Sequence, residues 1–372
     1  MEEAPLGGLS PQVFLRRHWQ KRPLLVRRAL PGFRGAIGKS ALFALAARND
    51  VESRLVQRRG GRWAVTHGPL DRSSLEKART RDWTLLVNGV NGHSKHAEQL
   101  LRRFAFVPQA RLDDVMVSYA APGGGVGPHV DSYDVFLIQG AGRRLWRLAR
   151  PRPAGRPFAL VPGAPLKLIA DFAPEDEYLL EPGDLLYLPP GWGHDGVALD
   201  ACFTCSVGFR APRGAELAAA FLDYLHERGL PDATYRDPGL RASRNPARIG
   251  GPMTAFAGAV LNRIRWNRAD ATELLGRYLT TPKSNVVFRK RAKAGRLTSR
   301  VAVLDAKTQL LYAGKRFFIN GESFVPRAGQ RRALARLADR RRAPGRVLAR
   351  AGLEPLVSDW QRAGYLRLES SS

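Results

Sequence analysis

The segment GPHVDSYDVFLIQGAGRRLWRL, residues 127–148, decides the fold of this chain. Its runs VFLIQ and RRLWRL are rich in β-prone residues, and the glycine-containing turn GAG separates them. Similar short runs recur from Leu112 to Arg210, among them DDVMVSYAA, GDLLYLP and CFTCSVGFR. Many short strands separated by Gly and Pro turns predict a β-sandwich or a β-barrel.

The regions on either side of this β-rich segment have helical periodicity. Ser10 before Pro11 predicts an N-cap followed by a proline in the first helical turn. After Arg213, apolar residues at helical spacing predict a second, all-helical region, and short strands with a helix at Gln330–Arg340 follow it. We therefore expect an α+β protein with domains at 1–211, 212–287 and 288–372, because 372 residues exceed one compact core.

Composition limits the cellular context and the partners. Sixty Lys and Arg against 33 Asp and Glu give a net charge of +27, which favours binding to nucleic acid or to a nucleoprotein, although a GC-rich genome also enriches arginine. No apolar run is long enough for a membrane span, and the N-terminus has no signal-peptide pattern. Cys202 and Cys205 should face opposite sides of one strand, so we expect no disulfide and a reducing, cytoplasmic location.

A candidate metal site lies within the β-rich segment. His129 and Asp131 are two residues apart, so on a strand their side chains point to the same face. His194, in LPPGWGHDG, is the natural third ligand and is expected in the turn between two strands. Two histidines and one carboxylate leave open positions on a metal and are typical of iron(II) oxygenases, with zinc or manganese as alternatives.

Three further residues could complete such a site. Alternation along RRLWRL places Arg144 and Trp146 on one face, and an inward guanidinium would need an anion such as a dicarboxylate; the alternative is that Arg143 and Arg144 both face solvent. Ser118, on the preceding strand, could donate to the same anion. If the strand that begins at His129 continues through Leu137, Tyr133 points toward the metal and could contact a substrate.

Several ordered motifs together resemble the bacterial ribosomal oxygenases of the JmjC/cupin group. They are FLRRHWQKRPLL, VSYAAPGGGVGPHVDSYDVFLIQGAGRRLWRL, EPGDLLYLPPGWGHDG, SVGFRAP and YLTTPKSNVVF. The resemblance implies a double-stranded β-helix, a helical dimerisation domain and a winged-helix-like C-terminal domain. It also implies Fe(II), 2-oxoglutarate and O2 as cofactor and co-substrates, with His129, Asp131 and His194 as iron ligands.

The same resemblance assigns the remaining roles. Arg144 matches the arginine that binds 2-oxoglutarate, and Ser118 matches a serine that contacts it. The implied reaction is hydroxylation of an arginine β-carbon in a large-subunit ribosomal protein, by a homodimer. The net charge of +27 separately suggests that the basic surface faces ribosomal RNA around the substrate, or acidic segments of a partner. The alternatives are a histidine hydroxylase of a ribosomal protein, or an inactive scaffold that binds ribosomes or nucleic acid.

Overall fold

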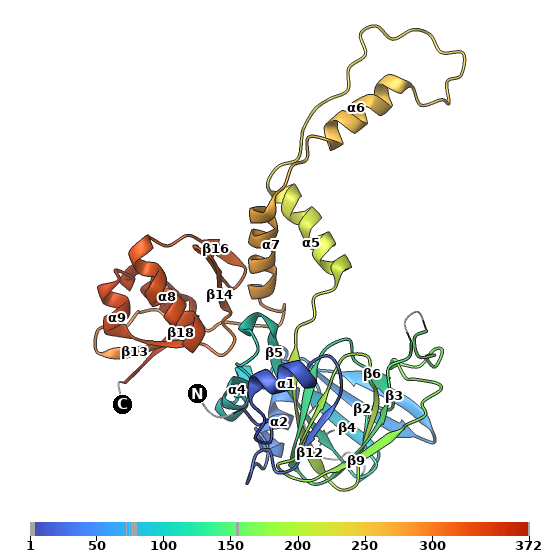
Figure 1. Ribbon diagram of the computed structural model, residues 1–372, viewed down its shortest axis with the longest axis vertical. Coiled ribbons are helices and arrows are strands. Elements are labelled where there is room, and N and C mark those ends of the chain that lie inside the picture. Colours follow the sequence, from blue (N-terminus) through green and yellow to red (C-terminus); the bar gives the residue numbers. More distant parts are fainter. Residues whose placement is uncertain (1–3, 72, 74, 76–79, 154–155, 371–372) are drawn as a thin grey trace. The chain divides into compact units, whose positions relative to one another are not determined.

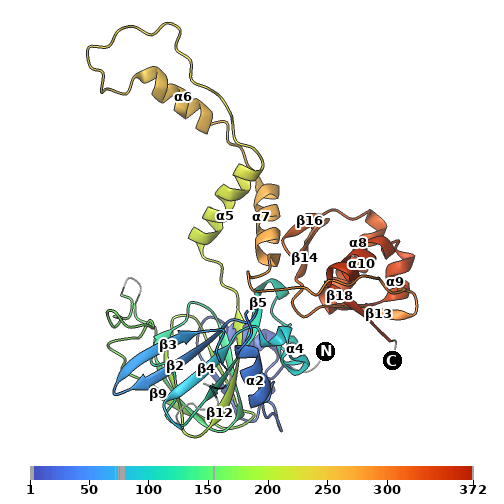
Figure 2. The same ribbon diagram turned by 180° about the vertical axis from the view of Figure 1, so that it is seen from behind.

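The computed structural model describes residues 4–370 except 72, 74, 76–79 and 154–155 (Figures 1 and 2). Its contacts divide the chain into two compact units. The first contains the chain up to Ala211, Pro282–Thr308 and the chain from Arg332 onward. The second contains Pro212–Thr281 and Gln309–Arg331. The domain boundaries expected from the sequence, at 211 and 287, stay predictions.

Two antiparallel sheets form the barrel of the first unit. The larger sheet has eight strands in the order β1 (Leu24–Val26), β10 (Leu185–Leu188), β7 (Val135–Ala141), β12 (Cys202–Phe209), β5 (Leu112–Ala120), β4 (Trp83–Val87), β2 (Ser53–Arg59) and β3 (Arg62–His67). The smaller sheet has four strands in the order β6 (His129–Val130), β11 (Gly193–Ala198), β8 (Arg144–Ala149) and β9 (Asp176–Leu180).

Strand β7 shows how the larger sheet separates two cores. Phe136 and Ile138 belong to a core that includes residues of three helices, α1 (Pro11–Arg17), α2 (Lys39–Ala46) and α4 (Lys95–Arg102). Val135 and Leu137 point the other way and pack with Trp146 and Leu148 of the smaller sheet. A strand covered on both faces is apolar throughout, as VFLI is. The predicted double-stranded β-helix is therefore confirmed, with helices on one face of the larger sheet and the smaller sheet on the other.

The first helix begins as the sequence predicts. Ser10 caps α1 by accepting a hydrogen bond from the backbone N–H of Val13, and Pro11 occupies the first turn. Two short 3-10 helices, at Val90–Gly92 and Gln109–Arg111, lie on either side of α4 in the sequence. No helix among the described residues is both long enough and apolar enough to cross a membrane.

The remaining elements are smaller. In the first unit, β17 (Arg342–Pro344), β13 (Arg300–Leu304) and β18 (Leu366–Ser370) form a sheet that is accompanied by α9 (Gly345–Arg350) and α10 (Glu354–Ala363). Helix α8 (Ala328–Arg340) precedes this group. The second unit holds α5 (Gly214–Glu227), α6 (Gly251–Leu261), α7 (Arg268–Thr280) and the sheet β14 (Leu310–Ala313), β15 (Arg316–Ile319) and β16 (Glu322–Phe324).

Two expectations about the strands near the candidate site are wrong. The strand of His129 does not continue to Leu137, because β6 ends at Val130 and the chain bends before β7. The fully buried Asp134 explains the bend: its carboxylate turns toward the helix-covered core, where Tyr187 donates a hydrogen bond at 2.6 Å. His194 lies on β11 and not in the turn that precedes it.

Candidate metal centre

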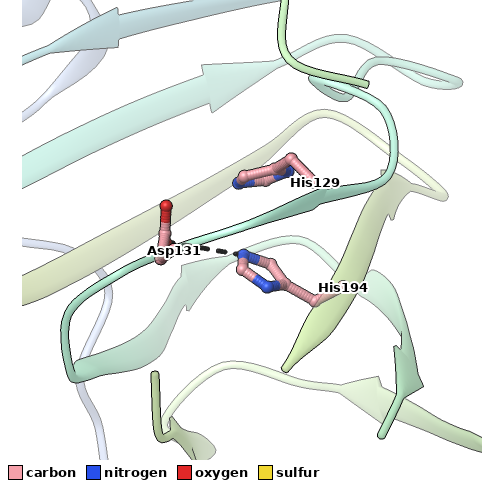
Figure 3. Close-up of side chains that lie close together, drawn as sticks. All are labelled: His129, Asp131 and His194. Carbon is pink, nitrogen blue, oxygen red and sulfur yellow. Dashed lines mark ion pairs between the residues drawn. The ribbon is translucent and has the colours of Figure 1, made fainter. Parts of the chain in front are cut away.

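The smaller sheet brings the three predicted ligands together. His194 on β11 pairs directly with His129 on β6, and Asp131 follows the end of β6. The two imidazole centroids are 4.2 Å apart, and Nε2 of His194 lies 3.7 Å from Oδ2 of Asp131. One ligand atom from each residue lies within 4.8 Å of the other two, as Figure 3 shows. The geometry is that of one small site with ligands from two adjacent strands.

Backbone carbonyl groups orient both imidazole rings. Nδ1 of His129 is 2.9 Å from the carbonyl oxygen of Gly127, and Nδ1 of His194 is 3.0 Å from that of Trp192. Because a carbonyl oxygen only accepts, each Nδ1 carries a proton, and Nε2 is the nitrogen available to a metal. Hydrogen bonds of this type commonly fix the tautomer of metal-binding histidines.

Burial keeps His194 in the form that binds metals. Desolvation, followed by the influence of His129, lowers the pKa of His194 to about 4. The ring is therefore neutral near pH 7. Two imidazoles and one carboxylate fit a divalent transition metal such as iron(II) and leave other coordination positions free. Among the described residues this is the one group of three or more His, Cys, Asp or Glu side chains that could hold a metal ion.

Arg144 points into the barrel, as the alternation of β8 predicted. Arg144 and Trp146 are each 5% exposed, whereas their strand neighbour Arg147 pairs with Glu177 on the surface. Nε and Nη2 of Arg144 are buried without a hydrogen-bond partner. An unpaired buried guanidinium is costly, so this position fits an anionic ligand that accepts hydrogen bonds.

Trp146 connects the arginine to the metal ligands. Its ring lies 5.7 Å from the guanidinium carbon of Arg144 and 5.9 Å from the ring of His194. In the register of β8 with β11, Trp146 stands opposite Gly196. A Cβ atom at Gly196 would lie 2.7 Å from the indole, so only glycine leaves room for this ring. Arg144, Trp146 and the histidines thus line one continuous interior surface.

The other two predicted residues have different surroundings. Ser118 on β5 is 3% exposed, and its hydroxyl lies 3.4 Å from the carbonyl oxygen of Thr204. Tyr133 is 40% exposed and lies in the bend between β6 and β7. Partial burial raises the pKa of Tyr133, and the charges of Asp131 and Asp114 raise it further. Ser118 is therefore an interior residue, and Tyr133 lies at the exposed edge of the site.

Three interior polar residues were missed by the sequence analysis. Thr84 on β4, Gln139 on β7 and Thr204 on β12 are each at most 1% exposed. Thr204 donates to the side-chain oxygen of Gln139 at 3.1 Å, and the hydroxyl of Thr84 has no partner. On β7, Val135, Leu137 and Gln139 alternate with the helix-facing residues and so point into the barrel. One polar residue at such an inward position of an apolar strand is the sequence feature that indicates Gln139.

The chain matches two protein families over separate segments. Residues 99–217 match the JmjC domain, and residues 263–366 match the ROXA-like winged helix. The chain is 42% identical to the ribosomal protein uL16 3-hydroxylase of Escherichia coli over 236 residues, which are 63% of this chain and 62% of that protein. It is 36% identical to a probable ribosomal oxygenase of Haemophilus influenzae over 65% of this chain and 60% of the relative. These matches span about three fifths of each curated relative.

Solved structures match over nearly the full length. The Escherichia coli ribosomal oxygenase YcfD in complex with cobalt and 2-oxoglutarate superposes with a TM-score of 0.81 at 31% identity, covering 98% of this chain and 99% of that one. The complex of the same protein with cobalt and succinic acid gives a TM-score of 0.80 at 31% identity and the same coverage. This chain therefore belongs to the JmjC-type ribosomal oxygenases.

Proposed function

We propose that this chain is an iron(II)- and 2-oxoglutarate-dependent oxygenase that hydroxylates the β-carbon of an arginine in a large-subunit ribosomal protein. One observation carries the proposal: the His129, Asp131 and His194 site shares an interior surface with the unpaired guanidinium of Arg144. A metal ion and a dicarboxylate are the two ligands that such a surface suits. The relative named a uL16 3-hydroxylase supports the choice of protein substrate and position.

Each residue of the site has a proposed role in binding the metal or the co-substrate. His129, Asp131 and His194 would hold iron(II) from one side, and Arg144 would bind the distal carboxylate of 2-oxoglutarate with charge-assisted hydrogen bonds. Ser118 would contribute a hydroxyl to the same co-substrate. When bound, the metal and its co-substrates supply the oxidising chemistry, O2 being consumed as 2-oxoglutarate is converted to succinate and carbon dioxide. Trp146 and Leu148 belong to the buried apolar cluster between the two sheets.

The exposed edge of the site suits a basic substrate side chain. A substrate arginine carries a permanent positive charge and needs acidic or aromatic groups around it. Tyr133 lies at this edge, within the electrostatic influence of Asp131 and Asp114. We therefore propose that Tyr133 contacts the target side chain.

The second unit is proposed to join two copies of the chain. Helix α6 has no buried residue, and Met253 and Leu261 are 50% and 65% exposed. Leu222 on α5 and Trp266 are 67% and 60% exposed. Large apolar side chains that stay exposed in one chain indicate a contact surface, so a homodimer is the proposed assembly. A ribosomal substrate places the proposed site of action in the cytoplasm.

Intact-mass measurement tests the function directly. The purified protein is incubated with Fe(II), 2-oxoglutarate and large-subunit ribosomal proteins, and the gain of one oxygen atom is mapped by fragmentation. The proposal predicts this gain on an arginine β-carbon, dependent on 2-oxoglutarate and accompanied by succinate. A hydroxylated histidine would replace the arginine assignment. If no substrate were oxidised and 2-oxoglutarate with Fe(II) gave no visible charge-transfer band, the inactive scaffold would be the better reading.

A further inference from the structure

Helix α8 carries a row of exposed arginines that the proposed reaction does not use. Its sequence, AGQRRALARLADR, includes Arg332, Arg336 and Arg340 at intervals of four residues. This spacing places the three side chains on one side of the helix. All three are exposed, whereas Leu334 and Leu337 on the opposite side are fully buried. The helix is thus amphipathic, with an outer face dominated by guanidinium groups.

Among the described residues, these three arginines have no acidic partner. No ion pair joins any of them to a carboxylate within the part of the chain that the structure describes. The acidic residue of the helix, Asp339, is engaged in an interaction of its own. Three further exposed arginines follow in β17 and α9, at Arg342, Arg346 and Arg350. Arg362 on α10, by contrast, is paired with Asp359, so the row on α8 is a local excess of positive charge.

The spacing of the row fits a regular polyanion better than a single anion. Eight residues separate Arg332 from Arg340, which corresponds to about 12 Å along the helix axis, or one guanidinium every ~6 Å. Isolated carboxylates or a single phosphate would engage one of these groups. The backbone of a nucleic acid presents phosphates in series, and arginine binds phosphate with bidentate geometry.

We propose that the outer face of α8, defined by Arg332, Arg336 and Arg340, binds the phosphate backbone of RNA. The choice of RNA rests on the proposed function, because a ribosomal protein substrate lies beside ribosomal RNA. The surface recognises the phosphate charges of the RNA and not its base sequence. Helix α10 offers no comparable row, because it carries Glu354 and Asp359 and its Arg362 is paired with Asp359. The arginine row lies on α8, labelled in Figures 1 and 2.

Salt dependence of RNA binding tests this surface quantitatively. The full-length protein is titrated against a labelled RNA duplex of about 20 base pairs, at salt concentrations from about 50 to 200 mM. The test variant is Arg332→Gln/Arg336→Gln/Arg340→Gln, which keeps good helix formers on the exposed face. The matched control is Arg236→Gln/Arg241→Gln/Arg244→Gln, which removes the same charge from exposed residues between α5 and α6.

The expected result is a change in slope for one variant alone. Affinity falls as salt rises, and each lost phosphate contact makes the slope of log affinity against log salt less steep by about 0.7 to 0.9. The slope of the α8 variant should therefore be smaller in magnitude by about 2 to 3. The control should keep the slope of the unmodified protein. A third variant, Arg332→Lys/Arg336→Lys/Arg340→Lys, should also keep it, which separates lost charge from a damaged helix. Equal losses in the α8 and control variants would overturn the proposal, because net charge alone would explain them.

Two further measurements separate this proposal from its rivals. If polyglutamate displaced the RNA as well as unlabelled RNA does, an acidic protein would be the better partner and the proposal would fail. Turnover of 2-oxoglutarate on an isolated peptide should be equal in all variants, since α8 contributes no residue to the barrel interior. If the α8 variant bound RNA like the unmodified protein while turnover was normal, the α8 surface alone would be rejected. If the unmodified protein bound RNA through α8 but showed no turnover, the proposed function alone would be rejected.

Discussion

His194 and Asp131, which lie in separate parts of the barrel sequence, place Nε2 and Oδ2 3.7 Å apart. The contact exists because β11 pairs with β6, so that His194 stands opposite His129 while Asp131 lies just beyond the end of β6. The contact between this imidazole and the carboxylate contributes little stability by itself, because the pKa of His194 is lowered to about 4 and the ring is uncharged near neutral pH. The arrangement is explained by a cation that all three side chains bind together.

Replacing Asp131 with alanine should therefore abolish the reaction. The site would lose its only anionic ligand and keep the two histidines. Changing a residue that merely supports a metal ligand lowers metal affinity by about 10- to 100-fold. Loss of a ligand itself should cost more, so affinity for Fe(II) should fall by at least about 100-fold. Succinate release coupled to substrate should fall to background. Calorimetric titration with Mn(II) measures the metal affinity, a succinate assay measures the release, and a thermal melt confirms folding. Wild-type succinate release in Asp131→Ala would contradict the role of this site.

Arg144→Ala should weaken 2-oxoglutarate binding. Hydrogen bonds to a charged group contribute about 1.5–3 kcal/mol each, so the apparent KM for 2-oxoglutarate should rise at least tenfold. Arg147→Ala is the matched control, because Arg147 lies on the same strand but pairs with Glu177 at the surface. Initial rates of succinate formation at varied 2-oxoglutarate give the comparison. An unchanged KM in Arg144→Ala, or an equal rise in both variants, would reject the anchor role.

The sequence predicts the ligand set better than it predicts the path of the chain between the ligands. An i, i+2 spacing identifies His129 and Asp131 as neighbours even though the strand ends at Val130. The early end of β6 depends on Asp134, whose partners Tyr187, Gln20 and Arg111 are distant in the sequence. Such long-range hydrogen bonds leave no local periodicity, so alternation from His129 to Leu137 was the wrong extrapolation.

The inward direction of Arg144 could be foreseen only as one of two alternatives. Alternation puts it with Trp146, but the strand alone does not say which face is interior. The register with β11 decides this, since Trp146 stands opposite Gly196. Interior polar residues such as Gln139 and Thr204 were overlooked for a related reason: their strands are apolar on both faces, and a single polar side chain there looks like a break in the pattern.

Gly196→Ala should disturb the site without touching a metal ligand. The added Cβ would lie 2.7 Å from the indole of Trp146, which is too close for any real contact. Overpacking of this kind costs about 1–3 kcal/mol in unfolding free energy, and a displaced Trp146 should also reduce turnover. Gly208→Ala is the control on β12, because its Cβ would meet no atom nearer than 3.9 Å. Denaturant unfolding and succinate assays on both variants measure the effect; equal stabilities would show that the indole has room to move.

Native Cys205 should resist alkylation until the pH is very high. Burial raises the pKa of the Cys205 thiol to about 12, partly offset by a hydrogen bond with the backbone of Ala36. The folded state therefore holds this proton more tightly than the unfolded state, so the associated stability is present below pH 9.0 and is lost as the pH rises toward about 12. Iodoacetamide labelling followed by mass spectrometry should modify Cys205 only after denaturation. Rapid labelling of the native protein near pH 8 would show that this region opens.

The proposed homodimer should depend on the exposed apolar residues of the second unit. Leu222 and Leu261 lie on α5 and α6 and are 67% and 65% exposed, so replacing both with glutamate should not disturb a core. Charged groups at an apolar contact would stay desolvated and unpaired, so the double variant should be monomeric at concentrations where the unmodified protein is dimeric. Light scattering after size-exclusion chromatography measures the mass of each.

The control Arg241→Glu/Arg248→Glu introduces the same two carboxylates at exposed positions between α5 and α6 and should leave the dimer intact. A Leu222→Glu/Leu261→Glu protein with the same mass as the unmodified one would place the interface elsewhere.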